Sequence, residues 1–261
     1  GVHPAFVEKD WYGVQVLKTL ATHQSDEITT IFSGGTSLSK AYGLIQRFSE
    51  DLDFRCRYVN ESSGNKRKSI RRGYRSSILS SVKGVSAISL EDQSVTAASN
   101  YIKFPLGYPQ NHSGHSSLRP HLEVEFSFTQ PRLDPELKPI QSLVSIHSEG
   151  EPETSILCLS PIETGADKIS ALTWRVLKRD RALEGDDPTM IRHLHDLAAL
   201  KPLLIEEQSL FLSTAIESFE EDQKSGKREV DSNFSESMAK ALDILGSDVL
   251  YKQEYSQFVD A

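Results

Sequence analysis

The sequence has few cysteines, no long apolar run and no surplus of positive charge. Only two of its 261 residues are cysteine, Cys56 and Cys158, and they form no CxxC pair, so neither a disulfide framework nor a structural zinc site is expected. Two isolated thiols are typical of the reducing cytoplasm, which is the location we expect. No apolar stretch approaches the roughly 20 residues that cross a bilayer, and the first residues lack the pattern of a secretory signal, so we expect no membrane partner.

The negative charge of the chain is unevenly distributed. A formal net charge of −8 argues against a protein that coats nucleic acid with its whole surface. One segment, NKRKSIRRGYR, nevertheless carries six cations and no acid: Lys66, Arg67, Lys68, Arg71, Arg72 and Arg75. A solvated helix surface would explain this segment, but the contrast with the rest of the chain favours a local contact with nucleic acid or a protein partner.

The hydrophobic pattern divides the chain into two parts. Residues 1–155 mix helical and strand patterns, whereas residues 156–261 read as helices only, so we expect an α+β fold with a second, helical domain. In the first part we predict helices over residues 6–20, 36–45 and 68–82 and strands over residues 28–32, 50–59, 85–92, 99–106 and 121–128. In the second part we predict helical segments over residues 162–180, 187–204, 206–222 and 233–259.

The stretch FSGGTSLSKAYGLIQRFSEDLDF holds the strongest chemical signal. Alternate residues of a strand point to one side, so Asp51 and Asp53 project together, opposite Leu52 and Phe54. Two carboxylates this close repel each other unless a cation lies between them, and Mg²⁺ prefers such oxygen ligands together with substrate phosphates. The preceding Gly34-Gly35 turn lets the backbone approach a phosphate closely. Each feature alone is typical of an ordinary turn or strand, but the two in this order indicate phosphoryl transfer.

These residues closely resemble the GGTxL…RxSxDLDF signature of the AbiEii/AbiGii toxin family, whose members have a nucleotidyltransferase fold. FVEKDWYGVQVLKTL is similar to the first helix of that family. The resemblance implies an N-terminal nucleotidyltransferase domain with a mixed sheet flanked by helices, and it makes Asp51 and Asp53 metal ligands. The residues that it implies for nucleotide binding are Ser33, Gly34, Gly35, Thr36, Lys40, Arg47, Ser49 and Lys168.

Four further positions complete the predicted site. A third carboxylate is expected on the strand HLEVEFSF, with Glu125 favoured and Glu123 the alternative; a plain amphipathic strand would also explain both. Lys168 matches a family lysine, which implies a phosphate contact. Asp196 matches a family acid and is expected to orient Lys168 or Arg192, to act as a base, or to form a structural ion pair. Arg119 lies near the third-carboxylate strand and is a candidate substrate contact.

The resemblance implies an enzyme that transfers a nucleoside monophosphate from an NTP to an acceptor hydroxyl, with two Mg²⁺ ions held by Asp51, Asp53 and Glu125. It implies the toxin of a type IV toxin–antitoxin or abortive-infection system. An antitoxin is then an expected partner, and RNA, especially the tRNA acceptor end, is the expected acceptor. Two alternatives stay open: a non-catalytic module that binds nucleotide or antitoxin, and a small-molecule nucleotidyltransferase.

Overall fold

The computed structural model describes residues 2–23, 25–61, 63–112, 114–115 and 117–260, which form two compact units, Gly1–Ser160 and Pro161–Ala261. The boundary expected between residues 155 and 156 falls inside strand β7 (Thr154–Cys158), which pairs within the sheet of the first unit. The two units divide between Ser160 and Pro161, after β7 and at the start of the helix that follows it.

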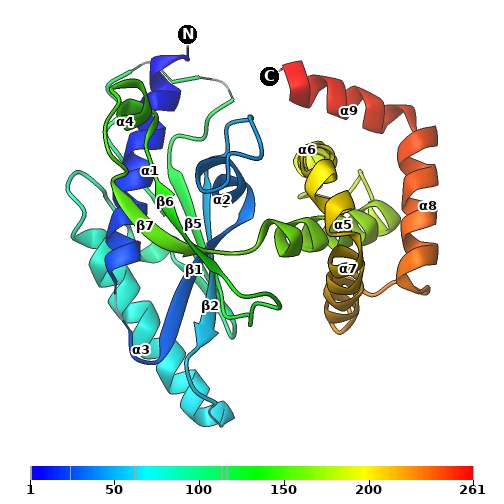
Figure 1. Ribbon diagram of the computed structural model, residues 1–261, viewed down its shortest axis with the longest axis horizontal. Helices are drawn as coiled ribbons and strands as arrows, with labels where there is room; N and C mark the ends of the chain where they lie inside the picture. Colours follow the sequence, from blue (N-terminus) through cyan, green and yellow to red (C-terminus); the bar gives the residue numbers. More distant parts are fainter. Residues whose placement is uncertain (1, 24, 62, 113, 116, 261) are drawn as a thin grey trace. The chain divides into compact units, whose positions relative to one another are not determined.

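A mixed seven-stranded sheet forms the centre of the described part of the first unit (Figure 1). β2 is parallel to β5 and β1 is parallel to β7, while the other neighbours are antiparallel. The predicted mixed sheet flanked by helices is thus confirmed. Its strands, in the spatial order β3-β4-β5-β2-β1-β7-β6, are Thr96–Ala98, Tyr101–Leu106, Leu122–Ser127, Asp51–Tyr58, Ile28–Ser33, Thr154–Cys158 and Glu136–Ile140.

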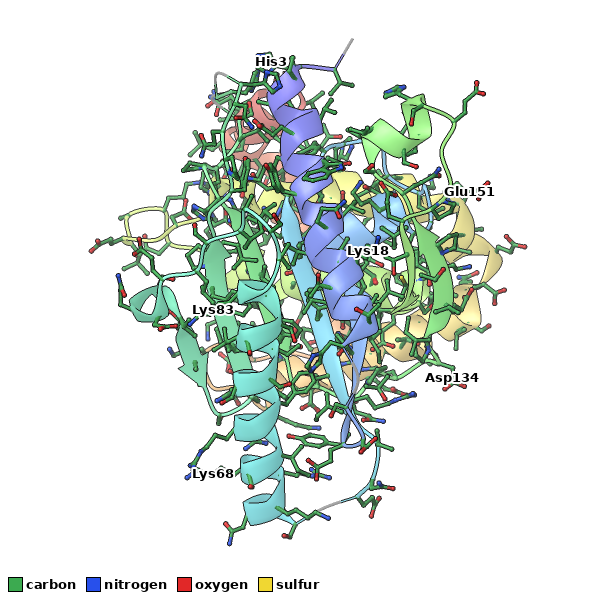
Figure 2. All side chains as sticks on the ribbon, turned by 90° about the vertical axis from the view of Figure 1, so that its left-hand side faces the viewer. His3, Lys18, Lys68, Lys83, Asp134 and Glu151 are labelled. Carbon is green, nitrogen blue, oxygen red and sulfur yellow. The ribbon has the colours of Figure 1, made fainter. Side chains whose placement is uncertain are left out.

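The hydrophobic core lies on one face of this sheet, under helices α1 (Pro4–Thr22) and α3 (Gly64–Lys83) (Figure 2). The side chains of β2 alternate, so Leu52 and Phe54 are buried in this core. Phe54 stacks on Phe126 of β5 with the ring centroids 4.7 Å apart. Because of the same alternation, the odd-numbered residues of β2 and β5, which include the predicted carboxylates, lie on the opposite face.

Two local predictions were wrong. Residues 85–92 form no strand, because Ala87 takes a positive φ of 64° and only an isolated bridge joins Ser89 to Gly107. The helix expected to reach residue 45 is the shorter α2 (Gly34–Lys40). Gly43 has a φ of 63°, which stops the helix from continuing. The Leu44 N–H donates back to the Leu38 carbonyl at 3.0 Å, as at other helix ends that glycine terminates.

Strands β6 and β7 and the short helix α4 (Leu143–His147) were not predicted. β6 contains Pro139, a residue that lowers any strand prediction but is tolerated on an edge strand such as this one. β7 is five residues long, and a short apolar run does not distinguish strand from helix.

The second unit is helical in its described residues, as predicted. Its helices are α5 (Pro161–Lys178), α6 (Arg192–Glu206), α7 (Gln208–Gln223), α8 (Phe234–Ser247) and α9 (Val249–Asp260), and the chain also forms short 3-10 turns η1 (Asp92–Ser94) and η2 (Pro188–Ile191). The segment predicted over residues 233–259 is two helices, because Asp248 is extended and ends α8. None of the helices described has the length and hydrophobicity to cross a membrane.

Candidate active site

The glycine turn lies directly against the second aspartate of the Asp-Leu-Asp pair. The antiparallel register of β1 and β2 places Ser33, the last residue of β1, opposite Asp53. Gly34 follows with a φ of 73°, and a Cβ built on it would overlap the Asp53 carboxylate. Glycine is therefore required at position 34 for two reasons, namely its backbone conformation and the close approach of Asp53.

Three other motif residues surround the same turn. A Cβ on Gly35 would lie 2.9 Å from the Arg47 Nη2 and 2.9 Å from the Ser49 Oγ. The Thr36 hydroxyl donates to the Asp51 carbonyl at 2.5 Å. The spaced residues of the sequence motif thus meet in space around residues 34–36.

Four carboxylates occupy neighbouring positions on the face of the sheet opposite the core. In the parallel register of β2 and β5, Asp51 lies opposite Glu123 and Asp53 lies opposite Glu125. Both candidates for the third carboxylate therefore accompany the aspartates. Like charges directly opposite each other destabilise a sheet, so this face needs compensating cations.

Glu123 is already compensated by its neighbours. Its carboxylate pairs with the Lys103 ammonium, and its Oε2 lies 3.2 Å from the His121 Nε2. Glu123 is also buried. Glu123 therefore belongs to a buried ion pair with Lys103.

Glu125 has a different setting, beside the Tyr101 hydroxyl of β4. Burial raises the pKa of Tyr101 to about 12, and so do the charge and the hydrogen bond of Glu125 and, more weakly, the charge of Asp53. These effects require Tyr101, Glu125 and Asp53 to lie close together. Glu125 is half-buried and shares its register position with Asp53 rather than Asp51.

Arg119 places a cation next to Asp51. Its Nη2 donates to the Asp51 carboxylate, and its Nε donates to the Glu50 Oε1 at 2.9 Å. Burial alone would lower the pKa of Arg119, but Asp51 and Glu50 outweigh burial and raise it. Glu50 in turn accepts from the buried Lys9 ammonium. The pKa of Lys9 is lowered by burial, against the opposing effect of Glu50.

Neither Glu50 nor Lys9 was predicted to belong to the site. Lys9 belongs to the EKD segment of the first helix, and Glu50 directly precedes the Asp-Leu-Asp pair. Their positions beside motif residues were the available signal, but only the structure joins them to Arg119.

Lys168 and Asp196 come together within the second unit. The Lys168 Nζ lies 2.8 Å from the Asp196 Oδ2, and the Asp196 side chain is fully buried. Of the roles considered for Asp196, holding Lys168 and forming an ion pair both match this contact. His193 and His195 have different surroundings and are not arranged to bind one metal ion together. His195 contacts the Tyr255 hydroxyl, whereas His193 is close enough to Lys168 to be affected by its charge.

The comparison with protein families decides the identity of the fold. Residues 15–261 match the model of the AbiEii nucleotidyl transferase toxins of type IV toxin–antitoxin systems. The chain belongs to the AbiEii family. It is therefore a nucleotidyltransferase and a toxin of the type IV class, for which an NTP substrate and an antitoxin partner follow.

A solved structure supports the fold. The chain is similar to MenT4, a nucleotidyltransferase toxin of Mycobacterium tuberculosis H37Rv, with a TM-score of 0.57 and 20% sequence identity, over 88% of this chain and 70% of that one. The comparison with curated proteins gave no match.

Lys40 of this AbiEii-family chain was predicted to bind nucleotide, and the structure shows it in another contact. Its ammonium pairs with Asp10 of α1 and donates to the Gln141 carbonyl at 3.3 Å. Asp10 also accepts from the Leu143 N–H at 2.7 Å. These contacts join α1, α2 and α4, and the role of Lys40 toward nucleotide stays a prediction.

The six cations of the basic segment divide into two groups on α3. Arg67, Arg71 and Arg75 contact the sheet unit itself: the Arg67 guanidinium lies 5.2 Å from the Tyr58 ring, Arg71 donates to the Tyr58 hydroxyl at 2.9 Å, and Arg75 donates to the Tyr101 carbonyl at 2.9 Å. The other three are exposed, as Arg67 also is: Lys66, Lys68 (labelled in Figure 2) and Arg72.

The donor chemistry of the site suits a hard divalent cation. Among the residues that the structure describes, no group of three or more His, Cys, Asp or Glu side chains is arranged to hold a metal ion. Asp51 and Asp53 on one strand face nevertheless provide the one or two carboxylates that Mg²⁺ usually takes from a protein, with phosphates and water as the other ligands. The residues present therefore fit a divalent cation whose remaining ligands are phosphate and water oxygens.

Proposed function

We propose that the sheet unit transfers a nucleoside monophosphate from an NTP to an acceptor hydroxyl and releases pyrophosphate. In this proposal Asp51 and Asp53 hold Mg²⁺, with two ions in the working site, and Glu125 is the third carboxylate. The observation that carries the proposal is the register that sets Asp53 between Gly34 and Glu125. Glu125 is preferred to Glu123 because it shares its register position with Asp53, the aspartate that lies against Gly34.

The residues of the chain itself have separable tasks in this reaction. The backbone of residues 34–36 approaches the triphosphate closely because glycine adds no side chain there. Ser33, Arg47 and Ser49 surround the same turn and orient the phosphates. When bound, Mg²⁺ neutralises the charge of the triphosphate and favours ionisation of the attacking hydroxyl. Glu125 and Tyr101 interact with each other and lie beside Asp53 in the site.

The roles of Lys168 and Asp196 remain predictions from the family resemblance. An ammonium that contacts the phosphates would offset the charge that develops during transfer. Lys168→Met is expected to lower kcat by about 100-fold, as loss of such a group does. An unchanged kcat would contradict the assignment.

The acceptor that we propose is RNA, with the tRNA acceptor end as the leading candidate. The supporting feature is the exposed group on α3, since Lys66, Lys68 and Arg72 give a local cationic surface on a chain of net charge −8. The same surface suits an acidic antitoxin. We rank RNA first because binding to a polyanion needs no further shape match.

A labelling assay tests the reaction. The full chain is incubated with Mg²⁺, total tRNA and each of the four NTPs labelled at the α-phosphate, and the Asp51→Asn, Asp53→Asn double variant is run beside it. We expect label in RNA from the wild type and none from the double variant. Lys83→Ala, which removes an exposed surface ion pair far from the motif in sequence, is the control that should label normally.

The destination of the label separates the alternatives. Label in protein would replace RNA by a protein acceptor, and label in a small molecule from a cell extract would indicate the antibiotic-modifying type of transferase. Bound nucleotide without any label would indicate the non-catalytic module.

Salt dependence tests the RNA surface. The variant Lys66→Ala, Lys68→Ala, Arg72→Ala is expected to bind tRNA more weakly. It should also reduce the slope of log affinity against log salt by up to about 3, because each of the three cations neutralises at most one phosphate. The control removes three exposed lysines elsewhere, namely Lys18, Lys83 and Lys224. Equal slopes for the two variants would show that charge in general, and not this surface, binds the RNA.

A further inference from the structure

The Arg119 side chain is bound to the Asp51 carboxylate, which the proposed reaction needs as a metal ligand. Its Nη2 donates to the Asp51 Oδ1, while its Nη1 lies 4.0 Å from the Glu123 Oε2. Asp51 is the first residue of β2 and one of two proposed metal ligands. A guanidinium and a divalent cation are alternative partners for the same oxygen, since both neutralise it and neither tolerates the other at contact distance.

The backbone of Arg119 is held by two hydrogen bonds, whereas its side chain is partly exposed. The Arg119 N–H donates to the Glu50 Oε2 at 3.2 Å, and the Arg119 carbonyl accepts from the Lys9 ammonium at 2.8 Å. The Lys9 side chain is only 1% exposed, so this attachment is internal. The Arg119 side chain is 37% exposed and reaches Asp51 through a flexible stem. The residue is therefore anchored beside the site with a head group that can change partner.

Phosphate is the natural second partner of such a head group. Guanidinium presents a planar set of donors that matches phosphate oxygens in pairs, and a nucleotide bound at the glycine turn would bring three phosphates beside Asp51. Glu50, which holds the Nε at 2.9 Å, limits how far the guanidinium moves from the site.

We propose that Arg119 is a displaceable cation of the active site: its guanidinium neutralises Asp51 before a divalent cation binds, gives up this carboxylate when the cation arrives, and then contacts the triphosphate. This inference rests on the proposed function, because it takes Asp51 as a metal ligand. It adds to the motif residues a substrate contact and a competitor for the metal in one side chain.

Two binding measurements without turnover test it. Mn²⁺ binding to the full chain is titrated by the loss of the free Mn²⁺ paramagnetic resonance signal, and binding of inorganic tripolyphosphate in saturating Mn²⁺ is measured by calorimetry. For Arg119→Gln we expect Mn²⁺ alone to bind several-fold more tightly and tripolyphosphate to bind about tenfold more weakly, as loss of a charge-assisted hydrogen bond implies. Arg119→Lys, which keeps the charge without the paired donors, should bind Mn²⁺ like the wild type but tripolyphosphate more weakly.

The opposite signs of the two changes separate this inference from a structural role. A loosened site would weaken both ligands, so weaker or unchanged Mn²⁺ binding by Arg119→Gln, or unchanged tripolyphosphate binding, overturns the proposal. The Asp51→Asn, Asp53→Asn variant distinguishes the underlying failure: if the wild type binds Mn²⁺ no better than this variant, the metal site itself is wrong and the inference falls with it. Lys83→Ala should match the wild type in both titrations.

Discussion

The substitution Gly34→Ala tests the packing of the glycine turn on the catalytic strand. A φ of 73° costs a residue with a Cβ about 1–2 kcal/mol. The new Cβ would also overlap the Asp53 carboxylate, which must leave its preferred rotamer at a cost of about 0.5–1.5 kcal/mol. We therefore expect a loss of about 2–3 kcal/mol in the free energy of unfolding. Displacement of Asp53 should also reduce transfer activity far more than the stability loss alone would.

Two other glycines of the same unit separate these contributions. Gly43 has a φ of 63° but no atom within 4 Å of an added Cβ, so Gly43→Ala should show the backbone cost alone, about 1–2 kcal/mol. Gly73 lies exposed within α3 and has nothing within 4 Å of an added Cβ, so Gly73→Ala should stabilise the helix by about 1 kcal/mol. The excess cost of Gly34→Ala over Gly43→Ala measures the contact with Asp53.

Urea unfolding followed by tryptophan fluorescence provides the measurement. The two tryptophans lie in different units, so a Trp174→Phe background leaves Trp11 to report on the sheet unit. In an Asp53→Ala background the excess cost of Gly34→Ala should disappear, which a double-mutant cycle detects directly. An equal cost for Gly34→Ala and Gly43→Ala, with normal activity, would refute the close approach of Asp53 to the turn.

Three further predictions concern buried polar groups. Asp196→Ala should destabilise the helical unit by about 3 kcal/mol in urea, because it removes the buried partner of Lys168, and adding Lys168→Met should recover part of the loss; no loss would contradict the pairing. The pKa of His193 is lowered well below its ordinary value, first by burial and then by the charge of Lys168, so the folded unit keeps it neutral. The unfolded chain takes up a proton on His193 below its unfolded pKa of about 6.5, so the free energy of unfolding should fall as the pH drops below that value. His193→Gln should reduce the slope of the free energy of unfolding against pH, and equal slopes for the variant and the wild type would contradict a buried neutral His193. Burial raises the pKa of Cys56 and of Cys158 to about 12, so a thiol reagent at pH 8 should label neither until denaturant is added, and rapid labelling of the native protein would show that they are accessible.

The centre of the sheet could be predicted from the sequence because its signals are local. The two-residue period of a strand sets Asp51 and Asp53 on one side and Phe54 on the other, and a glycine pair marks the start of α2. Signals that depend on tertiary partners failed. β7 exists because it pairs with β6 along its length and with β1 at Cys158, and nothing within its five residues requires a strand.

The helical period would also have divided the basic segment into two groups of cations. Arg67, Arg71 and Arg75 recur at intervals of four residues, which places them on one side of a helix. That side contacts the tyrosine and backbone groups of β2 and β4, so half of the cationic segment belongs to the packing of α3. The helical period, applied to the charges as well as to the apolar residues, divides the segment in the same way.

The ion pairs of the active site could not be predicted from a sequence motif. Arg119 is 68 residues from Asp51 in the chain, and Lys9 is 41 residues from Glu50, yet these four groups form one network. A motif identifies the carboxylates that a metal needs but not the cation that neutralises Asp51 before the metal arrives. Because that cation competes with the metal, the metal affinity of a chain with an intact Asp-Leu-Asp pair depends on the residue at position 119 and on the two side chains that anchor it. A substitution at Lys9 or Glu50, neither of which the proposal places in contact with substrate, should therefore change metal binding through Arg119.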